Sequence, residues 1–276
     1  MNNNYTIYHL HSPYSNPIAG MDCLTPIELY VQQAKEWGMK SLGFSEHGNL
    51  FDWIAKKEMI EAAGMKYIHE MEAYVTANSI GEEKIRDNYH VVLIAKNYDG
   101  VLELNELSSK SFDKEHIYYQ PRITMDELFG TSDNILVTTA CIGGLLGTKS
   151  NEDVRERFIN FLRQNKERCF LEVQHHICEV QKEYNKYIYT LHKSLDIPII
   201  AGTDTHSYNS DYAAARLIVE KGAGKSYPDE DEFNLCMLSF DELIGEYKKQ
   251  GVLPEFAYLE AIENTNRMAD MVEEFT

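Results

Sequence analysis

The stretch that decides the fold of this chain is Ile197-Pro-Ile-Ile-Ala-Gly-Thr-Asp-Thr-His206, in which an apolar run leads directly into an Asp-x-His pair. The N-terminal stretch Thr6-Ile-Tyr-His-Leu-His11 has the same form and ends in a His-x-His pair. Residues i and i+2 of a strand point to the same side. Each stretch therefore places two metal-capable groups side by side where a strand ends. Imidazole and carboxylate ligands suit Zn, Mn or Fe, so the two pairs together predict a metalloenzyme.

Between these two stretches, strand-like apolar runs alternate with amphipathic helical stretches up to about residue 226. Seven βα units in sequence predict a parallel sheet, and their number favours a closed or nearly closed barrel. We expect residues 1–276 to form one domain, with the barrel over about 1–226 and a helical extension over 227–276. A loop over 225–232 precedes helices over 239–249 and 255–271, which we expect to pack on the barrel. The expected strands cover residues 6–9, 41–45, 66–76, 90–95, 135–139, 169–173 and 197–201.

Metal-capable residues accompany every expected strand. His47 follows the second strand, Glu72 lies on the third, His90 opens the fourth, Cys141 follows the fifth and His176 follows the sixth. Barrel enzymes build their active sites at the C-terminal ends of the strands. Because a random distribution of ten histidines would not give this pattern, we expect these side chains to meet at one rim.

Composition narrows the class of protein. The net charge of −18 and the absence of a Lys/Arg-rich stripe argue against a general nucleic-acid-binding groove, which uses a basic surface to neutralise phosphates. A nucleic-acid substrate would instead be held at one end by metals, and weakly. The sequence shows no signal peptide and no apolar run long enough for a membrane helix. Five scattered cysteines without a CxxC motif predict reduced thiols in the cytoplasm.

Seven short motifs, spread in order over essentially the whole chain, resemble the PHP (polymerase and histidinol phosphatase) domain. The resemblance is to the version that begins the α subunit of bacterial DNA polymerase III. The tail at 261–269 also resembles the helix that ends the domain there. The motifs are His-Leu-His-Ser-Pro-Tyr-Ser (9–15), Glu-His-Gly-Asn-Leu-Phe (46–51), Met-Glu-Ala-Tyr-Val (71–75), Tyr-His-Val-Val-Leu-Ile-Ala (89–95), Gln-Pro-Arg-Ile (120–123), Ala-Cys-Ile-Gly-Gly (140–144) and Thr-Asp-Thr-His (203–206).

The resemblance implies a fold and a set of ligands. The fold would be a distorted (β/α)7 TIM-like barrel of the α/β class, with two to three divalent metal ions (Zn, Mn or Fe) at its C-terminal rim. The first metal would be held by His9, His11, Glu72 and Asp204. Glu72 would bridge to a second metal completed by His90 and Cys141, and Asp22, His47 and His206 would hold the third.

The chain departs from the family pattern in two motifs. The acid that usually comes about seven residues after the second His is delayed here to Asp22. Glu46 stands where an Asp is usual, and we expect it to orient its neighbour without binding metal. Because no polymerase palm or fingers follow residue 276, we expect a free-standing domain, with a replicative polymerase as a possible partner.

The implied activity is metal-dependent phosphoester hydrolysis by metal-activated hydroxide, with Asp204 or His176 steering a proton and Arg122 contacting phosphate. Our first hypothesis is a phosphodiesterase on a single-stranded DNA or RNA end, such as a 3′–5′ exonuclease. The alternatives are a phosphomonoesterase on a small metabolite, a non-catalytic metal-binding module that docks on a polymerase, and an amidohydrolase. The Glu72 bridge and the Asp-Thr-His motif favour the PHP assignment over the last.

Overall fold

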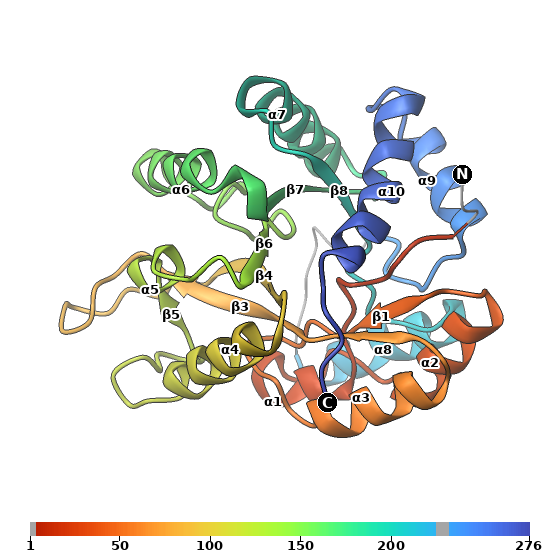
Figure 1. The fold of residues 1–276 in the computed structure, drawn as a ribbon, viewed down its shortest axis with the longest axis horizontal. Helices are drawn as coiled ribbons and strands as arrows, with labels where there is room; N and C mark the ends of the chain where they lie inside the picture. The colour runs from red at the N-terminus through yellow and green to blue at the C-terminus, as the bar shows by residue number, and fades with distance from the viewer. Residues whose placement is uncertain (1–3, 225–231) are drawn as a thin grey trace.

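The computed structural model describes residues 4–224 and 232–276, and Figure 1 shows a central ring of strands surrounded by helices. The strands are β1 (Ser41–Gly43), β2 (Lys66–Ile68), β3 (Glu70–Thr76), β4 (Tyr89–Ala95), β5 (Ile123–Thr124), β6 (Ile135–Thr138), β7 (Cys169–Gln174) and β8 (Ile199–Gly202). The helices are α1 (Asn16–Ala19), α2 (Ile27–Glu36), α3 (Trp53–Ala62), α4 (Tyr98–Ser111), α5 (Met125–Phe129), α6 (Glu152–Gln164), α7 (Glu179–Leu195), α8 (Ser210–Gly222), α9 (Phe240–Gln250) and α10 (Glu255–Asp270), with 3-10 turns η1 (Pro13–Ser15) and η2 (Lys166–Arg168).

Polar side chains fix where several of these helices begin. Asn97, Asn151 and Asn209 each accept a backbone N–H of the first turn of α4, α6 and α8. Capping boxes start α5 at Thr124 and α9 at Ser239, where the N-cap hydroxyl and the glutamate three residues later each accept a backbone N–H. Such caps satisfy donors that the helix itself leaves unpaired.

The ring closes through isolated bridges as well as through regular strands. A six-stranded sheet has the order β5-β3-β4-β6-β7-β8, and β1 pairs in parallel with β2. Parallel bridges join Ile7 to Leu42 beside β1 and Leu10 to Thr205 beyond β8. The segment around residues 6–10 therefore lies between β1 and β8. With β2 and β3 taken as one strand position and β5 lying outside the ring, the barrel has seven strand positions, as expected.

Strand direction differs from the all-parallel expectation. β4 is antiparallel to both of its neighbours, β3 and β6. The segment between β3 and β4 contains no helix, and without a helical crossover a following strand can return antiparallel beside the one before it. This reversal has a consequence for the site: it brings His90, at the beginning of β4, to the rim where the parallel strands end.

Three further strand predictions were wrong in detail. Residues 6–9 form a bridge and no regular strand. The expected strand over 66–76 is divided into β2 and β3 at His69, so one stretch pairs with β1 and the next with β4. The two-residue strand β5, which pairs with β3, was not expected. The predicted loop over 225–232 and the boundary near 226 fall almost wholly outside the described residues.

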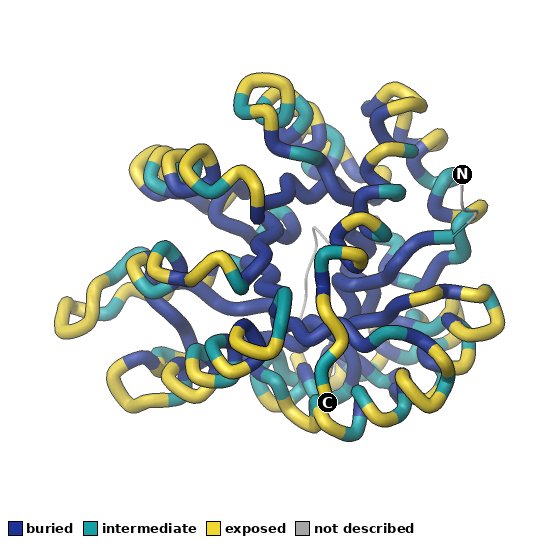
Figure 2. Tube along the Cα trace, in the orientation of Figure 1, coloured by how far each residue is buried: buried dark blue, intermediate teal, exposed yellow. Residues whose placement is uncertain are grey.

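The strands of the barrel are buried, as the dark blue of their trace in Figure 2 shows, whereas the surrounding helices carry exposed residues. Side chains from β2, β4, β6 and β8 form the inner cluster together with Met268, Ala269 and Val272 at the end of α10. The Lys66 ammonium donates to the backbone oxygens of Ala269 and Val272. The last turn of α10 thus packs against the barrel interior at the end opposite the rim. None of the described helices is both long and apolar enough to span a membrane.

Candidate metal centre

The rim surrounds a cavity of about 410 Å³. His9 and His11 are fully buried and do not line it, although both approach the carboxylates that do. Seven of the nine expected ligands line the cavity: Asp22, His47, Glu72, His90, Cys141, Asp204 and His206.

His9, His11 and Asp204 form the first group of donors. The Nε2 atoms of both histidines lie 3.2 Å from Oδ1 of Asp204. Burial by itself lowers the pKa of His9, but the carboxylates of Glu172 and Asp204 outweigh it and raise that pKa well above its usual value. For His11, burial and the neighbouring His47 and His206 lower the pKa to about 3. His11 is therefore a neutral imidazole at pH 7, ready to donate a lone pair.

Glu72 lies at the centre of the site. Its Oε1 is 3.4 Å from Nε2 of His9 and 2.9 Å from Nδ1 of His90. Its Oε2 is 2.5 Å from Nδ1 of His47 and 3.8 Å from Nε2 of His11. Burial opposes ionisation, but His90 and His47 hold the pKa of Glu72 well below its usual range. One carboxylate thus faces four imidazoles from three segments of the chain, and each of its two oxygens is free to approach a different cation, as a bridging ligand does.

His90 and Cys141 complete the second group with Glu72. The Cys141 Sγ lies 3.5 Å from Nδ1 of His90 and accepts the backbone N–H of Gly143 at 3.4 Å. Burial, followed by the charges of Asp204 and Glu72, raises the pKa of the thiol well above its usual value. The thiol therefore becomes a thiolate ligand only where a cation offsets those charges.

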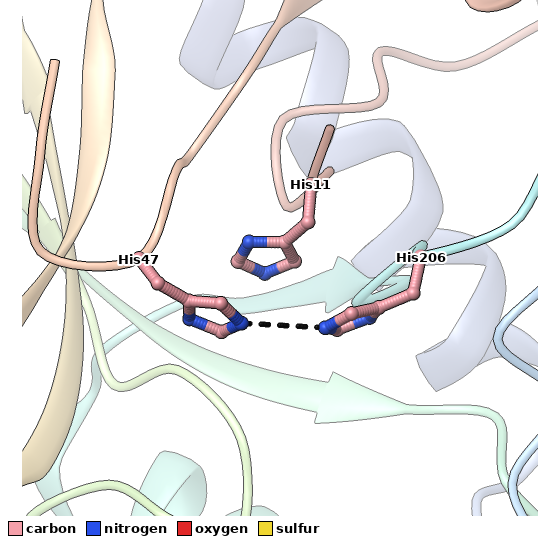
Figure 3. A group of neighbouring side chains, drawn as sticks. All are labelled: His11, His47 and His206. Atoms are coloured by element: carbon pink, nitrogen blue, oxygen red, sulfur yellow. Dashed lines mark hydrogen bonds between the residues drawn. The ribbon is translucent and has the colours of Figure 1, made fainter. Parts of the chain in front are cut away.

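Asp22, His47 and His206 form the third group. Oδ2 of Asp22 lies 3.2 Å from Nε2 of each histidine, and the two Nε2 atoms are 3.4 Å apart. Figure 3 shows the His47 and His206 rings meeting edge to edge, with the His11 ring beside them. On its other oxygen, Asp22 accepts from Nη2 of Arg216 at 2.6 Å. Burial raises the pKa of Asp22, but His206 and Arg216 bring it well below its usual range.

The side chains present fit divalent cations. Among the buried polar atoms of the described residues that make no hydrogen bond of acceptable geometry, five belong to this cluster. A buried polar atom without a partner is costly unless something else satisfies it, and imidazole, carboxylate and thiol groups are the ligands that Zn, Mn and Fe take. The atoms are Nε2 of His9, Nε2 of His11, Nδ1 of His47 and both carboxylate oxygens of Glu72.

A second layer of side chains orients these donors. Glu172, on β7, accepts from Nδ1 of His9 at 2.7 Å and from the Tyr8 hydroxyl at 2.8 Å. This contact fixes the tautomer of His9 so that Nε2 faces the cluster. Glu46 binds the buried Lys56 ammonium at 2.7 Å and the Ser15 hydroxyl at 2.5 Å. Glu46 thus lies behind the site, as the sequence indicated.

Backbone geometry also contributes to the rim. Asp204 and Ala140 adopt left-handed conformations, with φ of 49° and 54°, at the ends of β8 and β6. Such conformations are uncommon outside glycine and concentrate at functional sites. The delay of the acid to Asp22 has a local cause as well. The short helix α1 occupies 16–19, and the Asn16 side chain accepts the backbone N–H groups of Asp22 and Cys23.

Two of the predicted catalytic residues lie elsewhere than expected. Nη1 of Arg122 donates to Oδ1 of Asp87 at 2.6 Å, and the side chain is buried away from the metal cavity. The structure thus gives the Arg122 guanidinium a buried carboxylate as its partner, and contact of Arg122 with substrate phosphate stays a prediction. His176 is buried behind Phe233, on which its ring stacks at 4.5 Å. Burial, together with His175, lowers its pKa well below the usual value.

Sequence reasoning missed Glu172, Arg216 and Lys149. Glu172 could have been found, since Glu172 and Gln174 alternate on the strand that leads toward His176 and so share a face. Arg216 lies on α8, far along the chain from Asp22, and no local pattern signals their contact. Lys149 lines the cavity and is exposed, on the loop that follows Cys141.

The sequence is similar to known proteins of one family. The PHP domain family matches residues 8–176. The α subunit of DNA polymerase III from Borreliella burgdorferi is 32% identical over 97% of this chain, and that from Aquifex aeolicus is 30% identical over 79%. The chain spans only 23% and 20% of the lengths of these two relatives.

Two solved structures align with most of this chain at low similarity. A proposed metal-dependent phosphoesterase from Bifidobacterium adolescentis has a TM-score of 0.47 and 14% identity, covering 77% of this chain and 95% of its own. An amidohydrolase from Chromobacterium violaceum has a TM-score of 0.47 and 12% identity, covering 88% and 96%. Neither likeness is close enough to carry an argument about activity.

The fold and the site define a seven-stranded α/β barrel with a cluster of metal-capable side chains on one rim. Because the family match covers more than half of the chain, this protein belongs to the PHP domain family.

Proposed function

We propose that the protein is a metal-dependent phosphodiesterase acting on the end of a single-stranded DNA or RNA. The observation that carries the proposal is the Glu72 carboxylate, which is buried among four imidazoles and lacks a hydrogen bond. Two to three divalent cations would be held by the three groups of donors described above. When bound, they would supply charge stabilisation for phosphoryl oxygens and would acidify water.

The chain's own residues would orient the metal ligands, accept a proton and contact phosphate. Glu172 holds His9, and Arg216 holds Asp22, so that both donors are oriented before substrate arrives. Asp204 is the carboxylate that faces the cavity beside both histidines of the first group, and it would accept a proton there. Lys149 brings an ammonium group to the cavity wall, and we assign it the phosphate contact first expected of Arg122.

The test is cleavage of a 3′-labelled single-stranded oligonucleotide with Mn²⁺ or Zn²⁺, comparing the wild type with Asp204→Asn. We expect nucleotide release by the wild type and a loss on the order of a thousandfold in the variant. Asp241→Asn, an exposed acid-to-amide change on α9, is the matched control and should leave the rate unchanged. Release that survives in Asp204→Asn would contradict the proposed site.

One observation favours a second candidate, a phosphomonoesterase on a small metabolite. The net charge of −18 repels a polyanion more strongly than it repels a small phosphate ester. If the metal-loaded wild type releases no nucleotide but hydrolyses small phosphomonoesters, this candidate replaces the first. If it hydrolyses neither, a docking module on a replicative polymerase remains. The polymerase partner and the cytoplasmic location stay predictions.

A further inference from the structure

Two consecutive tyrosines stand on the surface just before β5. Tyr119 is 68% exposed and has a φ of 65°, a left-handed conformation that bulky residues rarely adopt. The backbone N–H of Tyr118 donates to the carbonyl of Gln120 at 3.1 Å, which makes Tyr119 the tip of a tight turn. Strained positions of this kind concentrate at ligand clamps. An exposed aromatic ring held in such a position calls for an explanation beyond packing.

Contacts between aromatic rings and arginine guanidinium groups hold this turn against the protein. The Arg122 guanidinium lies 5.5 Å from the Tyr118 ring centre, and the Tyr118 and Tyr119 rings meet edge to face at 4.7 Å. The Arg86 guanidinium lies 4.2 Å from the Tyr119 ring centre. Arg122 is itself fixed, since Nη1 donates to the Asp87 carboxylate and to the backbone oxygens of Ile85 and Asp87. The exposed ring is therefore held on a rigid base.

The turn is continuous with the wall of the metal cavity. Gln120 follows Tyr119 directly, Asn88 lies two residues after Arg86, and both line the cavity. The Asn88 side-chain amide donates to Oε1 of Gln120 at 2.6 Å, which ties the two segments together at the mouth. A group that extends from the cavity over Gln120 and Asn88 would thus reach Tyr119 and Arg86.

We propose that Tyr119 and Arg86 form a stacking subsite for a base of the single strand whose phosphodiester lies in the metal cavity. This inference rests on the proposed function and adds a substrate class to it. Every base has a π-face, so stacking on an aromatic ring beside a guanidinium binds single strands without reading their sequence. It also fits an acidic chain, because stacking gives affinity without the long basic groove that the protein lacks. In this arrangement Arg122 is a positioning residue for the tyrosine pair.

The first test measures binding without turnover. A single-stranded 10-mer carrying 2-aminopurine is titrated with wild-type protein in the presence of a chelator, and fluorescence quenching gives the Kd. We expect Tyr119→Ala to weaken binding about tenfold and to abolish most of the quenching, since one base–aromatic stack contributes about that factor. Tyr119→Trp should restore both. Tyr98→Ala, which removes another exposed tyrosine on α4, is the control and should match the wild type.

The second test separates this inference from the proposed function. With Mn²⁺ loaded, Tyr119→Ala should raise KM for the 10-mer about tenfold and change its kcat little, while hydrolysis of bis(p-nitrophenyl) phosphate by the wild type reports on the metal centre alone. If the wild type hydrolyses neither substrate, the proposed function fails, and the binding titration still decides the subsite. A Kd for Tyr119→Ala within twofold of the wild type would overturn the subsite, as would equal weakening by Tyr98→Ala.

Discussion

Protons and cations compete for the same atoms at the residue scale. Within the described structure, the carboxylates of Asp22, Glu72 and Asp204 are ionised, while His9, His47 and His206 all have raised pKa values. Without a cation, the neighbouring carboxylates therefore favour the protonated form of each of these three imidazoles. A metal ligand must be deprotonated, so each cation that binds displaces protons from this cluster.

This competition predicts the pH dependence of metal uptake. Burial lowers the pKa of His47, but Glu72 and Asp22 outweigh it and raise the pKa to about 10, against an ordinary 6.5. The proton on His47 therefore opposes the cation at pH 7, and the apparent metal affinity should rise as the pH increases from 6.5 toward 10. Calorimetric titration with Zn²⁺ in buffers of different ionisation enthalpy should show proton release at pH 7 that diminishes at higher pH.

The same raised pKa of His47 makes the metal-free protein less stable as the pH rises. Because the folded-state pKa of His47 is raised, its contribution to stability is fully present below pH 6.5 and is lost as the pH rises through about 10. Metal-free protein should therefore lose stability over the range in which metal binding strengthens. Uptake of Zn²⁺ without proton release at pH 7 would contradict this account of the cluster.

Helix α8 controls one ligand at the element scale. Arg216, on this helix, donates from Nε and Nη2 to the Asp22 carboxylate and from Nε to the Asp22 backbone oxygen, and it also pairs with Glu220. All three side chains are buried. The contact joins α8 to the loop that carries Asp22, so the helix fixes the position of a donor nearly two hundred residues earlier in the chain.

Arg216→Met should therefore destabilise the protein, and most strongly without metal. Removing one partner of a buried ion pair costs on the order of 3–5 kcal/mol, because the other charge stays buried. A cation beside Asp22 would offset part of this cost, so chemical denaturation should give a larger loss in chelator than with Mn²⁺. Arg163→Met on α6, where the guanidinium reaches the side chain of Asn160, is the control and should change the free energy of unfolding little. Equal losses with and without metal would argue against a cation beside Asp22.

The barrel concentrates its charge at one end of the molecule. The rim holds the donor cluster, and the opposite end packs against the apolar last turn of α10. Collecting several buried carboxylates and imidazoles at the rim is costly, and buried partners such as Glu172, Lys56 and Arg216 offset part of that cost. Because cations would bind this rim in the folded state and not in the unfolded chain, binding adds to stability by mass action.

Chelation should therefore lower the melting temperature of the whole molecule. A cation present at about a thousand times its Kd stabilises the folded state by about 4 kcal/mol, which for a chain of this size corresponds to roughly 10 °C. Differential scanning calorimetry before and after chelation measures the shift, and far-UV circular dichroism should stay unchanged at 25 °C. Glu72→Gln, which removes the bridging charge, should show a smaller shift. If chelator leaves the melting temperature of the metal-loaded wild type unchanged, the proposed metal centre is contradicted.

The sequence by itself determined the types of metal-ligand donor, their order along the chain and the seven strand positions that carry them. The reason is local: strand periodicity places residues two apart on one side, as in His9-Leu-His11 and Asp204-Thr-His206, and apolar runs mark where each strand ends. Only the tertiary structure decided how close these donors lie in space, and it set His11 beside His47 and His206 as well as beside His9 and Asp204. It reversed β4 to bring His90 to the rim, withdrew Arg122 into an ion pair with Asp87, and placed Arg216 against Asp22. Such contacts join residues far apart in the chain, and no sequence period records a distance through space.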